Sequence, residues 1–121
     1  MKALLLVAHG SRREASNDEV RALTDSLGGI QSDYDHVDCA FLELAAPSIP
    51  DGIRRAIDAG ADELVVLPYF LSAGRHVSKD IPGEVDSVRA EFPNVRISLA
   101  PYLGASPQIA NILMTQAAYV Q

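Results

Sequence analysis

The sequence has little cysteine and no long apolar run, and each shortage excludes a class of protein. Its 121 residues contain one cysteine, Cys39, which excludes an intrachain disulfide and a cysteine-rich zinc site. The opening apolar run, residues 3–8, is far shorter than the ~20 residues of a membrane span, and His9 to Arg13 follow where a signal peptide would be cleaved. We therefore expect no membrane segment and no leader, and a reducing, cytoplasmic location.

Positive charge is also scarce. The chain has 16 acidic and 10 basic residues, giving a net charge of −6. Proteins that bind nucleic acid or anionic membranes normally carry a basic surplus, so both kinds of partner are disfavoured. The length and the ordinary globular composition predict one domain over residues 1–121.

Apolar periodicity predicts alternating strands and helices. Residues 2–8 are apolar on both faces, which is typical of a strand inside a parallel sheet, whereas Ile49, Ile53 and Ile57 recur at helical spacing. The expected elements are a strand over 2–8, a helix over 14–27, a strand over 34–42, a helix from 47–48 to Gly60, a strand over 63–70, a loop over 74–78, a helix from 80–82 to about 92, a strand over 95–100 and a last helix from 106–107, with Ile109, Ile112, Leu113 and Val120 along its face. The pattern predicts an α/β fold: a doubly wound, mostly parallel four-stranded sheet with helices on both faces.

Three polar side chains follow the strands of this predicted sheet. His9 follows the first strand, Glu43 the second and His76 the third. Because ligands of such folds bind outside the carboxyl ends of the strands, we expect these side chains at one edge, where two imidazoles and a carboxylate suit a divalent transition metal. Each also has an ordinary explanation. His9 could be a loop histidine that caps the following helix, Glu43 a surface charge after a strand, and His76 a solvated loop histidine. His36 lies at the opposite end and is expected to be structural or solvated, and Cys39 to be a small core residue.

Basic residues gather at the same edge. Arg12 and Arg13 follow His9, and Arg75 and Lys79 bracket His76. Arginine at a helix N-terminus opposes the helix dipole, so simple solvation of helix ends explains this placement poorly. The geometry of a guanidinium group suits hydrogen bonding to carboxylate and phosphate oxygens. The pattern therefore favours a positively charged edge that binds a polyanionic ligand.

Three blocks of the sequence resemble those of one enzyme family. They are Leu4-Leu5-Leu6-Val7-Ala8-His9-Gly10-Ser11-Arg12, Phe41-Leu42-Glu43-Leu44-Ala45-Ala46-Pro47-Ser48-Ile49, and Leu67 to Pro82 with its Gly74-Arg75-His76-Val77-Ser78-Lys79-Asp80-Ile81-Pro82. In order and spacing they are similar to the sirohydrochlorin chelatases of the CbiX/SirB type, and the resemblance covers essentially the whole chain. The third block is the most specific of the three.

The resemblance implies an ATP-independent chelatase that inserts a divalent metal, either cobalt, iron or nickel, into sirohydrochlorin, for cobalamin or siroheme biosynthesis and with no organic cofactor. It implies that His9 and His76 bind the metal and that Glu43 is the acidic catalytic residue. Arg12, Arg75 and Lys79 are assigned to the carboxylates of the tetrapyrrole on charge alone.

Many relatives contain two such units in one chain, with the tetrapyrrole between them. This sequence resembles the short, single-unit members, which work as homodimers. We therefore expect a symmetric dimer that rebuilds the two-lobed site.

Two other functions use similar residues. A histidine phosphatase also opens with a strand running into His-Gly, but it places an arginine before the histidine, where this chain has Ala8. A non-enzymatic carrier of metal or tetrapyrrole would keep the same histidines and basic residues, and only turnover separates it from a chelatase. A nucleotide-binding module is disfavoured because the first loop lacks a glycine-rich phosphate cradle.

Overall fold

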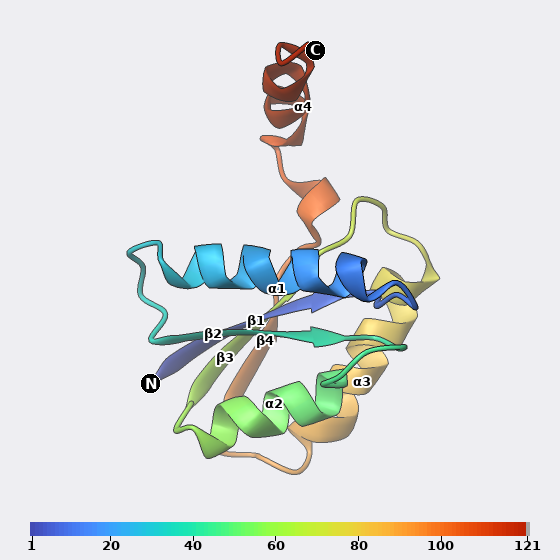
Figure 1. The fold of residues 1–121 in the computed structure, drawn as a ribbon. Helices are drawn as coiled ribbons and strands as arrows, with labels where there is room; N and C mark the ends of the chain where they lie inside the picture. Colours follow the sequence, from blue (N-terminus) through green and yellow to red (C-terminus); the bar gives the residue numbers. More distant parts are fainter. Residues whose placement is uncertain (121) are drawn as a thin grey trace.

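A four-stranded parallel sheet forms the centre of the computed structural model, which describes residues 1–120 (Figure 1). The strands lie in the order β2-β1-β3-β4 and are β1 (Lys2–Ala8), β2 (His36–Phe41), β3 (Glu63–Pro68) and β4 (Arg96–Leu99). The helices are α1 (Glu14–Gly28), α2 (Ile49–Asp58), α3 (Ile81–Arg89) and α4 (Ile109–Ala117), with a π-helical turn η1 (His76–Asp80) and a 3₁₀ turn η2 (Leu103–Ala105). The predicted α/β class and the order of strands and helices are confirmed. Within residues 1–120, no helix is both long enough and apolar enough to cross a bilayer.

Helices α2 and α3 cover one face of the sheet and form the larger core with it. Ile53 of α2 and Val85 of α3 are almost fully buried against Leu5 and Val66 of the sheet. Ser48 caps the start of α2, where its hydroxyl accepts a hydrogen bond from the backbone N–H of Asp51. The helical spacing of the isoleucines in the sequence therefore corresponds to the face that α2 buries.

Helix α1 covers the opposite face over β1 and β2. Val20 packs with Leu6, Cys39 and Phe41 in a smaller core. Burial raises the pKa of the Cys39 thiol, which is consistent with a packed and unreactive side chain. The prediction that Cys39 is a small core residue is confirmed.

Two expectations for the second half of the chain are wrong. The segment 74–78 is not simply a loop, because His76 begins the turn η1, which runs directly into α3. The last helix does not line the core: Ile112 and Leu113 are exposed, Val120 lies beyond the helix end, and α4 projects away from the sheet (Figure 1). The apolar stripe of that helix was visible in the sequence, but nothing there showed whether the same chain covers it.

Two glycines near the starts of helices offer a matched test of this packing. Alanine at Gly52 would place its Cβ 2.9 Å from the Ala40 Cβ, whereas a Cβ at Gly83 would meet nothing within 4 Å. We expect Gly52→Ala to destabilise the protein by about 1–3 kcal/mol through overpacking. Gly83→Ala should stabilise it by up to about 1 kcal/mol, because alanine restricts the unfolded chain. Denaturant unfolding measures both free energies, and equal effects would contradict the packing of α2 on the sheet.

Candidate functional site

The loops after β1 and β2 continue the pairing of the two strands and bring His9 beside Glu43. The backbone N–H of Leu42 donates to the carbonyl of Ala8, and that of Glu43 donates to the carbonyl of His9. Gly10 has a φ of +93°, and a Cβ there would lie 1.7 Å from the Glu43 carbonyl oxygen, so only glycine allows this approach. The His9 Nε2 lies 3.2 Å from Oε1 of Glu43 as a result.

A buried asparagine anchors the loop that carries His9. Asn17, in the first turns of α1, is 1% exposed. Its Oδ1 accepts a hydrogen bond from the backbone N–H of Ser11, and its Nδ2 donates to the carbonyl of Ser11 and to Glu14. The amide group therefore fixes the residue two positions after His9 and satisfies its own polar atoms.

His76 reaches the same edge from β3. The backbone N–H of Tyr69 donates to the carbonyl of Val7, which extends the pairing of β1 and β3, and the chain then returns in the turn η1. The rings of His9 and His76 have centroids 4.8 Å apart and planes at 62°. Their side chains are 43% and 45% exposed, so a ligand can approach both rings from solvent.

Each imidazole makes a hydrogen bond through Nδ1. The His9 Nδ1 lies 2.9 Å from the Gly10 carbonyl oxygen, and the His76 Nδ1 lies 2.8 Å from Oδ2 of Asp80. Both oxygens only accept, so both Nδ1 atoms act as donors. A hydrogen bond from the His9 Nε2 to Glu43 then requires a second ring proton, and a divalent cation beside Nε2 would take the place of that proton.

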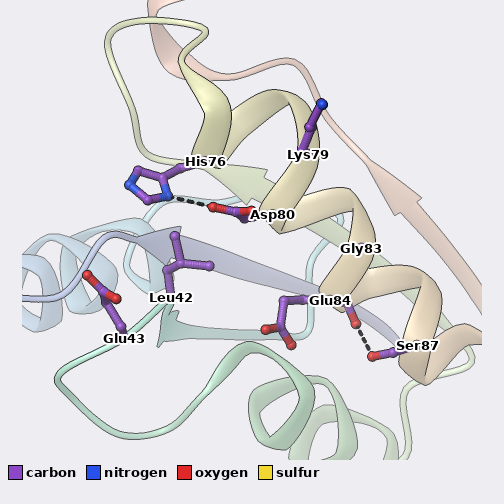
Figure 2. Close-up of a pocket in the computed structure, with 8 residues that line it drawn as sticks. All are labelled: Leu42, Glu43, His76, Lys79, Asp80, Gly83, Glu84 and Ser87. Atoms are coloured by element: carbon purple, nitrogen blue, oxygen red, sulfur yellow. Dashed lines mark hydrogen bonds and ion pairs between the residues drawn. The ribbon is translucent and has the colours of Figure 1, made fainter.

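A pocket of about 540 Å³ opens beside His76 (Figure 2). Its lining comes from the end of β2, the turn η1 and the exposed side of α3, and consists of Leu42, Glu43, His76, Lys79, Asp80, Gly83, Glu84 and Ser87. Three of these side chains are carboxylates, and the one lysine extends away from Glu43 and Glu84 (Figure 2). The pocket therefore offers a mainly acidic wall, which suits the approach of a cation.

Of the predicted basic residues, one lines this pocket. Arg12 and Arg75 are exposed at the same edge of the sheet, and only Lys79 lines the pocket itself. Their assignment to a polyanionic ligand stays a prediction. His36 begins β2 at the other end of the sheet and is not part of the site. Its Nε2 lies 4.0 Å from Oδ2 of Asp38.

The structure thus brings together His9, Glu43 and His76, but not as a closed set of ligands. Within residues 1–120, no three His, Cys, Asp or Glu side chains converge as a metal-binding group. His9 lies against both Glu43 and His76, which leaves an open arrangement.

Sequence reasoning missed two residues that support these histidines. The spacing of His76 and Asp80, four residues apart, would have indicated a contact once the segment was taken as helical. Asn17 lies three residues before Val20 on the buried side of α1, and a polar residue at such a position signals a buried hydrogen bond.

Comparison with known proteins gives matches along almost the whole chain. The CbiX family model matches residues 3–119. A sirohydrochlorin cobaltochelatase from Methanococcus maripaludis is 40% identical over 82 residues, which are 68% of this chain and 56% of that protein. A sirohydrochlorin cobaltochelatase from Sulfurisphaera tokodaii is 30% identical over 93% of this chain and 88% of its own length.

A solved structure gives the same result for the fold. SirB from Bacillus subtilis with Fe³⁺ superposes with a TM-score of 0.83 at 28% identity, over 99% of this chain and 48% of that one. The chain spans about half the length of several curated relatives that it matches, including the Methanococcus protein and a Priestia megaterium sirohydrochlorin ferrochelatase.

The anchoring role of Asn17 can be tested by its removal. In Asn17→Ala the backbone N–H and carbonyl of the half-buried Ser11 lose their partner, which should destabilise the protein by about 1–3 kcal/mol. Asn94→Ala, in the exposed turn before β4, is the matched control and should change the free energy of unfolding by less than about 0.5 kcal/mol. Equal values for the two variants in urea unfolding would show that Asn17 anchors nothing.

Proposed function

Because the chain belongs to the CbiX family, we propose that it inserts a divalent metal ion into sirohydrochlorin without using ATP. One observation carries this proposal: the rings of His9 and His76, from distant parts of the sequence, lie 4.8 Å apart, with Glu43 3.2 Å from the first of them. The names of the relatives, which are cobaltochelatases and ferrochelatases, support the same reaction.

In the proposed reaction the two histidines hold the incoming metal through Nε2. Two imidazoles leave most of the coordination sphere of the ion open, so the pyrrole nitrogens can bind before the histidines release it. A closed site with four protein ligands would retain the metal. The acidic wall of the pocket beside His76 attracts the cation toward these ligands.

Metal insertion also needs acceptors for two protons. The free tetrapyrrole loses two pyrrole N–H protons as the metal forms bonds to its nitrogens, so the charge of the arriving divalent ion is balanced. We assign Glu43 as a first acceptor, since its carboxylate lies beside the metal-binding nitrogen of His9. A histidine that has released the metal can accept the second proton.

The substrate side of the proposal rests on charge. Arg12, Arg75 and Lys79 would pair with the peripheral carboxylates of the tetrapyrrole. Cobalt and iron are the metals named for the relatives, and two histidines with a carboxylate suit nickel as well.

We place the protein in the cytoplasm, where its one cysteine would stay a thiol.

The two other candidate functions have less support. The residue before His9, Ala8, is buried and uncharged, so a histidine phosphatase would lack its phosphate-positioning charge. A carrier would bind the same ligands but would release no more than one metallated product per protein chain.

An insertion assay with sirohydrochlorin and Co²⁺ or Fe²⁺ tests the proposed reaction. We expect many product molecules per chain, and His9→Ala and His76→Ala should each lower the initial rate by at least about 100-fold, because each removes a metal ligand next to the proton-transfer step. His36→Ala is the matched control and should keep the rate of the unmodified protein. Stoichiometric metallation would indicate a carrier, and near-normal rates in either site variant would refute the assigned role.

We also propose that the protein works as a homodimer joined through α4. No charged residue occurs in residues 97–121, although the rest of the chain is well charged. In the structure Ile112, Leu113 and Met114 are 50%, 62% and 73% exposed. An exposed helix without charges is expected to be covered by another apolar surface.

A second copy of this chain offers such a surface. On the α1 side of the sheet, Val65 is only half-buried and its register partner Ser98 is exposed, so the β3–β4 half of this face remains accessible. The chain's own α4 is directed away from it, because the N–H of Gly104 donates to the carbonyl of Phe70 and fixes the preceding turn η2 (Figure 1). Reciprocal docking of α4 would bury two such helices in one dimer, at about 1.5–3 kcal/mol for each large apolar side chain fully covered.

Light scattering and cross-linking test this assembly. We expect a mass of about twice 13.0 kDa for the intact protein. When a tagged Ser98→Cys chain is mixed with an untagged Leu113→Cys chain, oxidation should join the two different chains, since the native Cys39 is buried. A monomer in solution, or a doubly substituted chain that forms only an internal disulfide, would contradict exchange of α4 between copies.

A further inference from the structure

The two histidines of the site are held by different kinds of acceptor. The His9 Nδ1 donates to a backbone carbonyl, that of Gly10, whereas the His76 Nδ1 donates to a side chain, the carboxylate of Asp80. A neutral imidazole carries its proton on either nitrogen, and the partner of one nitrogen decides which. With both Nδ1 atoms engaged as donors, both Nε2 atoms keep a free lone pair.

The contact between His76 and Asp80 arises from the helical turn. Residues four apart in η1 lie on the same side, and Oδ2 of Asp80 comes within 2.8 Å of Nδ1. The His76 side chain is 45% exposed, so packing alone constrains its ring weakly. Figure 2 shows the ring of His76 beside the carboxylate of Asp80, to which the hydrogen bond joins it.

We propose that Asp80 is a positioning residue for His76. Its carboxylate accepts a hydrogen bond from Nδ1–H, keeps the ring in one tautomer and orientation, and leaves Nε2 free to bind a divalent metal beside His9. The inference rests on the proposed function and goes beyond it, because it assigns a role to a residue that acts through His76. Outer partners of this kind raise the basicity of a ligating histidine and reduce the disorder that metal binding must overcome.

Substitutions of Glu84 distinguish the positioning role of Asp80 from a general effect of its negative charge. Glu84 lies four residues after Asp80, on the next turn, and lines the same pocket. Removal of either carboxylate makes the pocket less acidic. Of these two carboxylates, only that of Asp80 is hydrogen-bonded to His76 in the contacts of the described residues 1–120.

Nitrogen NMR on ¹⁵N-histidine-labelled, metal-free protein at mildly alkaline pH reads the tautomer directly. The unmodified protein should show His76 with its proton on Nδ1, and Asp80→Ala should move that proton to Nε2 or to a mixture of both forms. Asp80→Asn keeps an acceptor oxygen and should retain the Nδ1–H form, and Glu84→Ala should leave His76 unchanged. His9 should be unaffected in all three variants. An unchanged His76 tautomer in Asp80→Ala overturns the proposal.

Binding of Co²⁺ alone, followed by its visible absorption, gives the second readout. Asp80→Ala should weaken binding by about 10- to 100-fold. Asp80→Asn should recover most of this loss, and Glu84→Gln should show only the smaller effect of a lost charge. Equal losses in Asp80→Ala and Glu84→Ala would assign Asp80 to the general charge of the pocket and overturn its positioning role.

Neither measurement uses a tetrapyrrole, so the two proposals fail separately. A protein that shows the expected tautomer shift and Co²⁺ affinities but inserts no metal would contradict the proposed function only. A protein that turns over sirohydrochlorin and keeps the His76 tautomer in Asp80→Ala would contradict only the positioning role.

Discussion

The pairing of β1 with both β2 and β3 is the constraint on which the site depends. Parallel neighbours end at the same edge of the sheet, and here the hydrogen bonds continue past the strands, from Glu43 to the carbonyl of His9 and from Tyr69 to that of Val7. The side chains of His9 and Glu43 are therefore held by backbone rather than by flexible linkers. His76 joins them because η1 turns the chain back toward the centre of the same edge.

The sequence allowed the fold and the centre of the site to be predicted because both depend on strong local patterns. An unbroken apolar run identified the strand before His9, and alternating apolar residues identified the strand before Glu43. Both residues could then be placed at one edge by a general rule of parallel sheets. The helical state of His76 was not predictable in this way, since residues 76–80 have no apolar period. The contact with Asp80 exists only in that turn, and the role of Asn17 depends on how the loop at Ser11 packs on α1.

The position of α4 shows a different limit of sequence patterns. Its apolar residues indicated a helix with a face to bury. The helix is present, but none of its residues is buried in the structure, and periodicity contains no information on which surface would cover that face. The direction of α4 is set by long-range contacts before it, where Gly104 lies so close to the Leu71 carbonyl that a side chain would not fit. A short turn fixed by the loop after β3 thus holds this apolar helix away from the core of its own chain.

The two acceptors that hold the histidines also differ in how evolution or an engineer can change them. The backbone carbonyl that orients His9 is present whatever residue occupies position 10, and glycine is required there for a separate steric reason. The partner of His76 is a side chain that one codon change replaces. Under the proposed function, a substitution at position 80 would therefore change how His76 is held while the support of His9 stays constant.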